Sequence, residues 1–210
     1  GGLMKKYIPR LIEKKIENYL NIIGAIVIEG PKWSGKSTTA ERYANTIVKL
    51  QDPIVFRKYL LYSTTSKELL LQGVKPIMFD EWQKIPSLWD FIRLDVDDTG
   101  QMGSYILTGS SKPEEYSDKH TGTGRFVKIK MRTMSLWESG DSNGEVSIKE
   151  IFENKKVEIK ESNLTIKDLS EIICKGGWPG VSKYSVSDAI LFMRSYYETL
   201  TTEDIIDVDD

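Results

Sequence analysis

The chain has 210 residues, of which 40% are hydrophobic, and a formal net charge of −2 at pH 7. This length fits one α/β domain, or one domain and part of another, with enough apolar residues for a core. The near-neutral balance excludes the global basic field that points to nucleic acid. The single cysteine, Cys174, excludes an internal disulfide, so we expect a reducing, cytoplasmic location and a buried, unreactive thiol.

The first half of the chain alternates between strand and helix patterns. A helix is predicted over 9–20, and the apolar, β-branched run at 25–29 predicts a buried parallel strand. From Lys36 to about Leu50, apolar residues at helical spacing predict an amphipathic helix. We then expect a strand at 54–56, a helix at 66–72 that ends before Gly73, and a strand at 76–79.

The remaining elements indicate that the sequence pattern changes near residue 140. We expect a helix at 86–94, a strand at 104–107, a polar loop at 112–124 and a final strand at 126–129. A linker-like stretch at 139–144 precedes helices at 148–152, 165–174 and 189–200, and Thr165 with Asp168 resembles a capping box. We also find no signal peptide and no apolar run of about 18 residues, so we expect no membrane partner. These patterns predict an α/β domain over 1–140 and a mostly helical segment over 141–210.

The most informative motif follows the strand at 25–29. Residues 30–37 read Gly-Pro-Lys-Trp-Ser-Gly-Lys-Ser, which is the full spacing of a phosphate-binding loop. In this pattern the glycines let backbone N–H groups face a phosphate chain, Lys36 reaches the β- and γ-phosphates, and Ser37 ligates Mg²⁺. A glycine-rich turn with an accidental lysine is the alternative. The strand before and the helix after the motif favour the phosphate loop.

Two adjacent acids, Asp80 and Glu81, follow the predicted strand at 76–79. Asp80 can hold Mg²⁺ directly or through water, and Glu81 can polarise a water for in-line attack on a γ-phosphate. Paired acids after a strand also begin surface loops. The phosphate loop upstream favours the hydrolytic interpretation.

Thr108 and Ser110 follow the strand at 104–107. The carboxyl ends of parallel strands bind ligands, so either hydroxyl can contact the attacking water or the γ-phosphate, with a simple polar turn as the alternative. Arg125 comes after a glycine-rich loop and is either an arginine finger or a structural ion pair. Arg93 and Arg132 are weaker candidates for the finger.

Other nucleotide and metal chemistries are less consistent with the sequence. His120 is the only histidine and has no Cys or His partner nearby in sequence, which argues against a metal site or a Ser-His-Asp triad. The guanine-selecting run Asn-Lys-x-Asp is missing, because Val157 follows Asn154-Lys155-Lys156. No Leu-Ser-Gly-Gly-Gln run marks a transporter-type ATPase. Adenine is therefore the expected base, by elimination.

The order of these motifs resembles the prokaryotic AAA-type P-loop ATPases that carry a C-terminal domain of unknown function. The resemblance covers about residues 7–200 and rests on the phosphate loop, Phe79-Asp80-Glu81-Trp82-Gln83, Ile106-Leu107-Thr108-Gly109-Ser110-Ser111, His120-Thr121-Gly122-Thr123-Gly124-Arg125 and Met134-Ser135-Leu136-Trp137-Glu138-Ser139-Gly140. It implies an α/β P-loop NTPase (AAA-like) fold with three αβα layers, a parallel five-stranded sheet of order 5-1-4-3-2, and Mg-ATP as ligand. It also implies a second, often nuclease-like domain that opens at 176–180 and is mostly missing from this chain.

Site residues follow from the resemblance by position. Lys36 and Ser37 would contact phosphate and Mg²⁺, Asp80 would be the metal-side acid and Glu81 the base. Thr108 or Ser110 would take the sensor position, and Arg125 would act as a finger or sensor, in cis or from a neighbouring copy. The expected nucleotide contacts are Gly30, Pro31, Lys32, Trp33, Ser34, Gly35, Lys36, Ser37 and Thr38, with Tyr7 and Arg10 lining the adenine pocket. Trp33 and Trp82 either stack on a base or on a partner's DNA, or pack in the protein.

Three functions are then open. The first is an ATPase whose turnover drives or gates a conformational change, and the second is a nucleotide-sensing module that acts through a protein or DNA partner with negligible turnover. The third, a small-molecule P-loop kinase, is disfavoured because Glu81 stands beside Asp80. A homo-oligomer is expected if Arg125 works in trans.

Overall fold

The computed structural model describes residues 7–109, 122–156 and 162–202. Contacts within the chain divide it into two compact units, one over 9–132 and one that combines 1–8 with 133–210. The unit over 9–132 holds the sheet and the phosphate loop. The domain boundary predicted near residue 140 stays a prediction.

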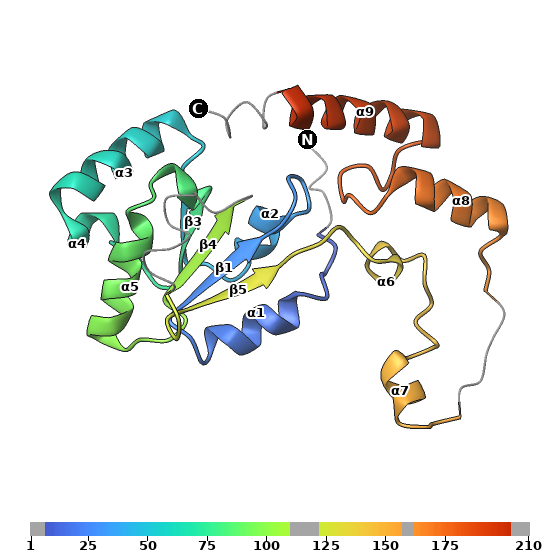
Figure 1. Ribbon diagram of the computed structural model, residues 1–210, viewed down its shortest axis with the longest axis horizontal. Coiled ribbons are helices and arrows are strands. Elements are labelled where there is room, and N and C mark those ends of the chain that lie inside the picture. Colours follow the sequence, from blue (N-terminus) through green and yellow to red (C-terminus); the bar gives the residue numbers. More distant parts are fainter. Residues whose placement is uncertain (1–6, 110–121, 157–161, 203–210) are drawn as a thin grey trace. The chain divides into compact units, whose positions relative to one another are not determined.

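A parallel five-stranded sheet is the centre of the 9–132 unit (Figure 1). Its strands lie in the order β2-β3-β4-β1-β5. Counted from the opposite edge, this is the predicted order 5-1-4-3-2, so the predicted fold class is confirmed. The strands are β1 (Ala25–Glu29), β2 (Thr46–Lys49), β3 (Ile77–Asp80), β4 (Tyr105–Gly109) and β5 (Phe126–Lys130).

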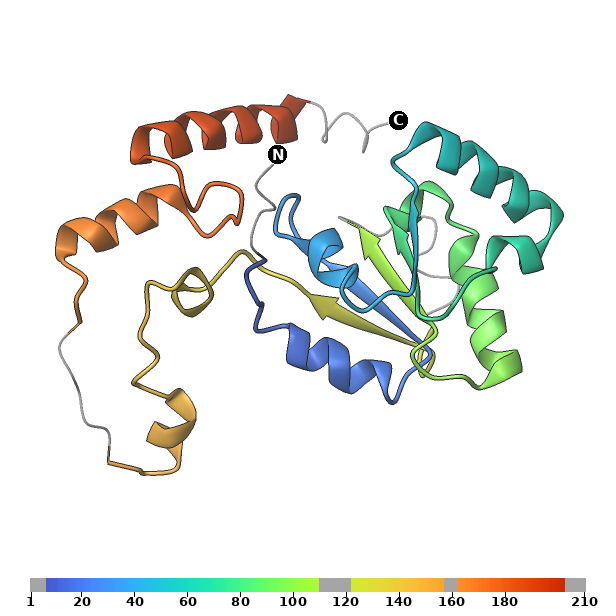
Figure 2. The same ribbon diagram turned by 180° about the vertical axis from the view of Figure 1, so that it is seen from behind.

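Helices cover both faces of the sheet and complete the three layers (Figures 1 and 2). Along β1, Ala25 and Val27 join one buried cluster, whereas Ile26 and Ile28 join the other. Strands buried on both faces are mostly apolar, as β1 is up to its last residue, Glu29. One face carries α3 (Pro53–Thr65), α4 (Lys67–Leu70) and α5 (Leu88–Thr99), and the other carries α1 (Glu13–Leu20) and α2 (Lys36–Ala40).

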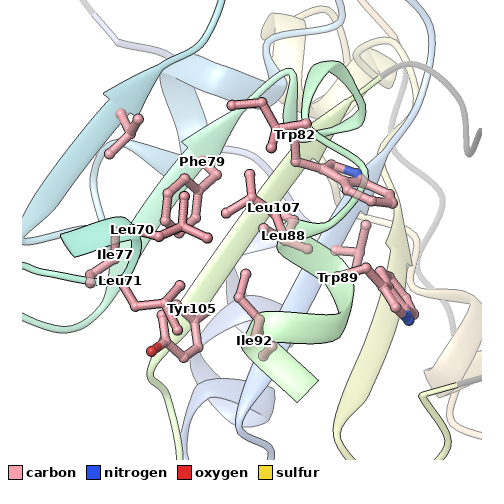
Figure 3. Packing of buried hydrophobic residues seen from close by; sticks show 14 of the residues in the cluster. Leu70, Leu71, Ile77, Phe79, Trp82, Leu88, Trp89, Ile92, Tyr105 and Leu107 are labelled. Atoms are coloured by element: carbon pink, nitrogen blue, oxygen red, sulfur yellow. The ribbon is translucent and has the colours of Figure 1, made fainter. Parts of the chain in front are cut away.

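The larger cluster contains most of the aromatic core (Figure 3). A short 3₁₀ turn, η1 (Trp82–Lys84), places Trp82 in this core with 1% of its surface exposed. Trp82 lies 5.4 Å from Trp89 between ring centroids, and Trp89 stacks on Phe126 at 4.0 Å. Trp82 therefore packs in the protein, which was one of the two roles left open by the sequence.

The helix predicted from Lys36 to about Leu50 is wrong beyond its first turn. It ends at Ala40, and Thr46–Lys49 is β2, which pairs with β3. Ala40, Tyr43 and Ala44 pack in one cluster against the sheet without forming one helix, so their spacing imitates an amphipathic stripe. The β-branched run at 46–48 favours the strand instead.

The strand predicted at 54–56 is also wrong, because these residues begin α3. The Asp52 side chain accepts hydrogen bonds from the backbone N–H groups of Ile54 and Val55, and Pro53 takes the first helical position. An aspartate N-cap followed by proline is a strong helix start. The apolar run hides this signal, since it also suits a strand.

The other unit is helical in the described residues. It contains α6 (Leu136–Ser139), α7 (Ile148–Phe152), α8 (Ile166–Lys175) and α9 (Val186–Thr202), and α8 packs on α9. The predicted capping box is confirmed, since Thr165 and Asp168 bond each other's backbone N–H groups. Cys174 is exposed on α8, so its predicted burial is wrong; the helix turns this position outward. None of the helices in the described ranges is both long enough and apolar enough to cross a membrane.

Helix α5 is fixed to the sheet by Asp95. Its carboxylate lies 2.8 Å from Lys75 Nζ and accepts a hydrogen bond from the Tyr105 hydroxyl. Burial alone would raise the pKa of Asp95, but the hydrogen bonds from Lys75 and Tyr105 hold it below its ordinary value. The charged form is thus stabilised by folding.

Replacing Asp95 with asparagine should lower the free energy of unfolding by about 1.5–3 kcal/mol at neutral pH, the usual value of a hydrogen bond to a charged group. Because the folded pKa of Asp95 is lowered, its contribution is complete above the unfolded pKa and is lost as pH falls through the folded pKa. Urea unfolding of both proteins at neutral and acid pH measures this. An equal difference in unfolding free energy between the two proteins at both pH values would contradict this role of the ion pair.

Candidate functional site

The phosphate loop connects the carboxyl end of β1 to α2 (Figure 2). Gly30 has φ 156°, and a Cβ there would lie 2.1 Å from the Met131 carbonyl oxygen, so no side chain fits. Gly35, with φ 99°, is in the left-handed region just before α2. Trp33 has φ 64°, a region that bulky residues rarely adopt. These backbone angles turn the loop sharply within a few residues.

Lys36 is buried, with 6% of its surface exposed. Its Nζ donates to the carbonyl oxygens of Gly30 and Pro31, each at 2.9 Å. An ammonium group has three N–H donors, so one can point to a ligand while two brace the loop. Burial lowers the pKa of Lys36, and the nearby carboxylates of Glu81 and Asp80 partly oppose this shift. The positive charge is therefore held close to the two acids.

Asp80 is the centre of the polar network at this edge of the sheet. It is 1% exposed, and its Oδ1 accepts hydrogen bonds from Ser37 Oγ at 2.7 Å and from the Thr108 hydroxyl. Gln51 Nε2 donates to Asp80 Oδ2 at 2.9 Å. The strand register explains why Asp80 and Thr108 lie close together, because the two residues pair at the carboxyl ends of β3 and β4. Ser37, Asp80 and Thr108 are thus brought together.

The sequence motifs assign no role to Gln51. Its position two residues after the end of β2 is a signal for such a role, since polar residues at the carboxyl ends of parallel strands line ligand sites. That signal was hidden by the helix predicted over the same segment.

The donor set fits a hard divalent cation. Ser37 and Asp80 offer a hydroxyl and a carboxylate oxygen, which are ligands that Mg²⁺ accepts alongside phosphate oxygens and water. Within the described ranges, no group of three or more His, Cys, Asp and Glu side chains could hold a metal by itself. A cation at Ser37 and Asp80 would therefore depend on ligands from the nucleotide.

Glu81 comes directly after β3 with φ 58°, in the left-handed region. Its carboxylate accepts a hydrogen bond from the side-chain amide of Gln83, which lies in η1. Gln83 Oε1 is buried, and no partner for it is found among the described residues. The carboxylate of Glu81 is thus held by a neutral amide, and the buried charge of Lys36 lies near it.

Arg125 lies far from this site within its own chain. It precedes Phe126, which pairs with Ala25 at the amino end of β1, whereas the phosphate loop follows the carboxyl end of the same strand. Its Nε donates to Asp97 Oδ1 at 2.6 Å, and this pair raises the pKa of Arg125. A finger acting in cis is therefore wrong, because the strand separates the two ends. A role in trans stays a prediction.

The other predicted contacts differ in exposure and position. Trp33 is 60% exposed, and its stacking on a base stays a prediction, as do contacts from the exposed Pro31, Lys32 and Thr38. Arg10 is 7% exposed and donates to the Ser34 carbonyl oxygen of the loop. Tyr7 belongs to the other unit, so its place near adenine also stays a prediction. Ser110 and His120 lie outside the described residues.

An open cavity of about 340 Å³ lies in the other unit. Its lining is mostly apolar and contains none of the predicted site residues. We therefore assign nucleotide chemistry to the loop rather than to this cavity, which is lined by Cys174, Ile190, Met193, Arg194, Tyr197 and Glu198.

The fold and the loop together define a P-loop protein of the Walker type. A protein-family model described as "AAA domain" matches residues 23–139, which is more than half of the chain. The chain therefore belongs to this AAA domain family. Membership and the meeting of Lys36, Ser37 and Asp80 support nucleotide binding.

One solved structure agrees on the fold, and a second aligns more weakly. The Walker-type ATPase PABY2304 of Pyrococcus abyssi aligns with a TM-score of 0.54 at 13% identity, over 98% of this chain and 76% of that chain. PCH-2 of C. elegans aligns with a TM-score of 0.39 at 11% identity, over 90% and 66% of the two chains. The curated proteins contain no match. At such identities the first likeness shows the fold alone.

Proposed function

We propose that the chain binds Mg-ATP at the carboxyl edge of the sheet and hydrolyses it to ADP and phosphate. The observation that carries the proposal is the meeting of Ser37 and Asp80, whose side chains are 2.7 Å apart although 43 residues separate them in sequence. Lys36 adds a buried cation beside them, and Glu81 follows Asp80 directly. This arrangement supports a site for a triphosphate, a divalent cation and an attacking water.

Each side chain has one task in the proposed reaction. Lys36 donates its remaining N–H group to the β- and γ-phosphates. Ser37 and Asp80 would hold Mg²⁺, which offsets charge on the phosphate oxygens when bound. Glu81 orients a water and accepts its proton as the water oxygen bonds to the γ-phosphorus; the bond from that phosphorus to the bridging oxygen breaks, and ADP leaves. Thr108 holds the Asp80 carboxylate in place.

The finer parts of the proposal rest on the sequence. We propose adenine because the guanine-selecting run is missing where Val157 follows Asn154-Lys155-Lys156. The assignment to AAA-type ATPases with a C-terminal, often nuclease-like domain rests on motif order. We further propose that turnover drives or gates a conformational change, or regulates a protein or DNA partner.

A second candidate is a nucleotide-sensing module with negligible hydrolysis. Two observations favour it. The Glu81 carboxylate is engaged by Gln83, and Arg125 is paired with Asp97 at the opposite end of the strands. A site that Arg125 does not reach in cis, and whose base is engaged, would turn over slowly until a partner completes it.

The test is phosphate release from Mg-ATP across a range of protein concentrations, with and without DNA. We expect release that requires Mg²⁺, and a specific rate that rises with concentration if Arg125 acts in trans. Nucleotide binding without phosphate release at any concentration would favour the sensing module. Protein that neither binds nor cleaves ATP would contradict both candidates.

A further inference from the structure

Arg10 joins two backbone segments that are far apart in the sequence. Its Nη1 donates to the Ser34 carbonyl oxygen at 2.6 Å, and its Nη2 donates to the Arg132 carbonyl oxygen at 2.8 Å. The side chain is 7% exposed, and its guanidinium is a planar fork with donors at fixed angles. One buried side chain thus fixes the loop relative to the segment that follows β5.

The contact at Ser34 determines where the next N–H group points. In a trans peptide the C=O bond and the following N–H bond lie in one plane and point in opposite directions. The only cis peptide bond identified in the described residues is Lys75–Pro76, so the Ser34–Gly35 peptide is trans. The Arg10 guanidinium at the Ser34 oxygen therefore makes the Gly35 N–H bond point away from Arg10. It also polarises this peptide group, which makes the N–H group a stronger hydrogen-bond donor.

Two further contacts hold the loop against the same segment. The Met131 N–H group donates to the Glu29 carbonyl oxygen at 2.7 Å. Gly30 lies so close to the Met131 carbonyl oxygen that a Cβ would be 2.1 Å from it. Arg132 is also the last residue of the 9–132 unit. The loop is thus braced at the point where the chain leaves this unit.

We propose that Arg10 is a positioning residue for phosphate binding: its guanidinium aims the Gly35 N–H group at the bound phosphates and holds the loop against residues 131–132. This inference rests on the proposed function, since it requires a triphosphate in the loop. It differs from the adenine-lining role that the sequence suggested for Arg10, and the two roles respond differently to a ligand without a base.

The test compares Mg-ATP with magnesium tripolyphosphate, both measured by calorimetry on the wild-type and Arg10→Lys proteins. Lysine keeps the charge but presents no planar fork, so we expect both ligands to bind the folded variant about ten-fold more weakly, by the same factor. Arg57→Lys is the matched control, because Arg57 is exposed on α3. That variant should bind both ligands as the wild type does.

Different failures have different meanings. Wild-type affinity for tripolyphosphate in the Arg10→Lys protein would overturn the inference, and a loss restricted to ATP would assign Arg10 to the adenine instead. If the wild type itself binds neither ligand, the proposed function fails and this inference with it.

A measurement on the wild type covers the case in which Arg10→Lys does not fold. Hydrogen exchange should slow in the loop and at Met131 together when magnesium tripolyphosphate is added, because the two segments are braced as one. Protection confined to the loop would overturn the coupling to residues 131–132.

Discussion

Replacing Lys36 with alanine should weaken the binding of Mg-ATP by about a hundred-fold or more. The ammonium group braces the loop by donating to the carbonyl oxygens of Gly30 and Pro31. Its remaining N–H group would donate to the expected phosphates. Each hydrogen bond to a charged group contributes about 1.5–3 kcal/mol, so losing the charge and the brace removes most of the phosphate affinity. Fluorescence titration with a labelled ATP analogue measures the change.

Lys14→Ala is the control for this substitution, because Lys14 is exposed on α1. It should bind the analogue as the wild type does. A Lys36→Ala protein that is folded and binds within about three-fold of the wild type would show that the loop does not hold the phosphates.

Replacing Glu81 with glutamine should leave ATP binding intact and reduce phosphate release by about 10²–10⁴-fold, the usual contribution of a general base. The amide keeps the shape of the side chain, and its oxygen can still accept the hydrogen bond from Gln83. What it loses is the ability to take a proton from the attacking water. Single-turnover phosphate release, with binding measured in parallel, separates these two effects.

The control here is Glu68→Gln, since Glu68 lies exposed on α4 and should not affect turnover. Equal phosphate release from the Glu81→Gln and wild-type proteins would exclude Glu81 as the base. Loss of binding together with turnover would instead give Glu81 a role in holding the nucleotide.

The sheet was largely predictable because its strands are local and strongly patterned. The runs that form β1, β3 and β4 are mostly apolar before their carboxyl ends, and they alternate with turns or helices as parallel sheets require. The phosphate loop and Asp80 were predictable for the same reason, since each stands at a fixed distance from a strand end. Here local sequence and tertiary structure agree.

The errors arose where tertiary contacts decide between two local options. Residues 46–49 suit a helix by periodicity and a strand by their β-branched side chains, and their pairing with β3 decides for the strand. Arg125 follows a glycine-rich loop, but the strand after it, β5, begins beside the amino end of β1, opposite the phosphate loop. The direction of a strand within a sheet is not contained in a short motif.

The contacts of Gln51 and Arg10 were missed for a related reason. Gln51 reaches Asp80 across two adjacent strands, and Arg10 reaches Ser34 and Arg132 from before α1. Such hydrogen bonds join segments that are distant in sequence, and neither residue type has a spacing rule that would reveal its partner. The structure is needed to place both side chains at the site.

The most direct test of the account is calorimetric titration of the Glu81→Gln protein with Mg-ATP, because this variant should not consume its ligand. We expect one ATP per chain, weaker binding when EDTA removes Mg²⁺, and competition by tripolyphosphate. An absence of binding by the folded variant at millimolar ATP, or binding indifferent to both Mg²⁺ and tripolyphosphate, would contradict a magnesium nucleotide site at Lys36, Ser37 and Asp80.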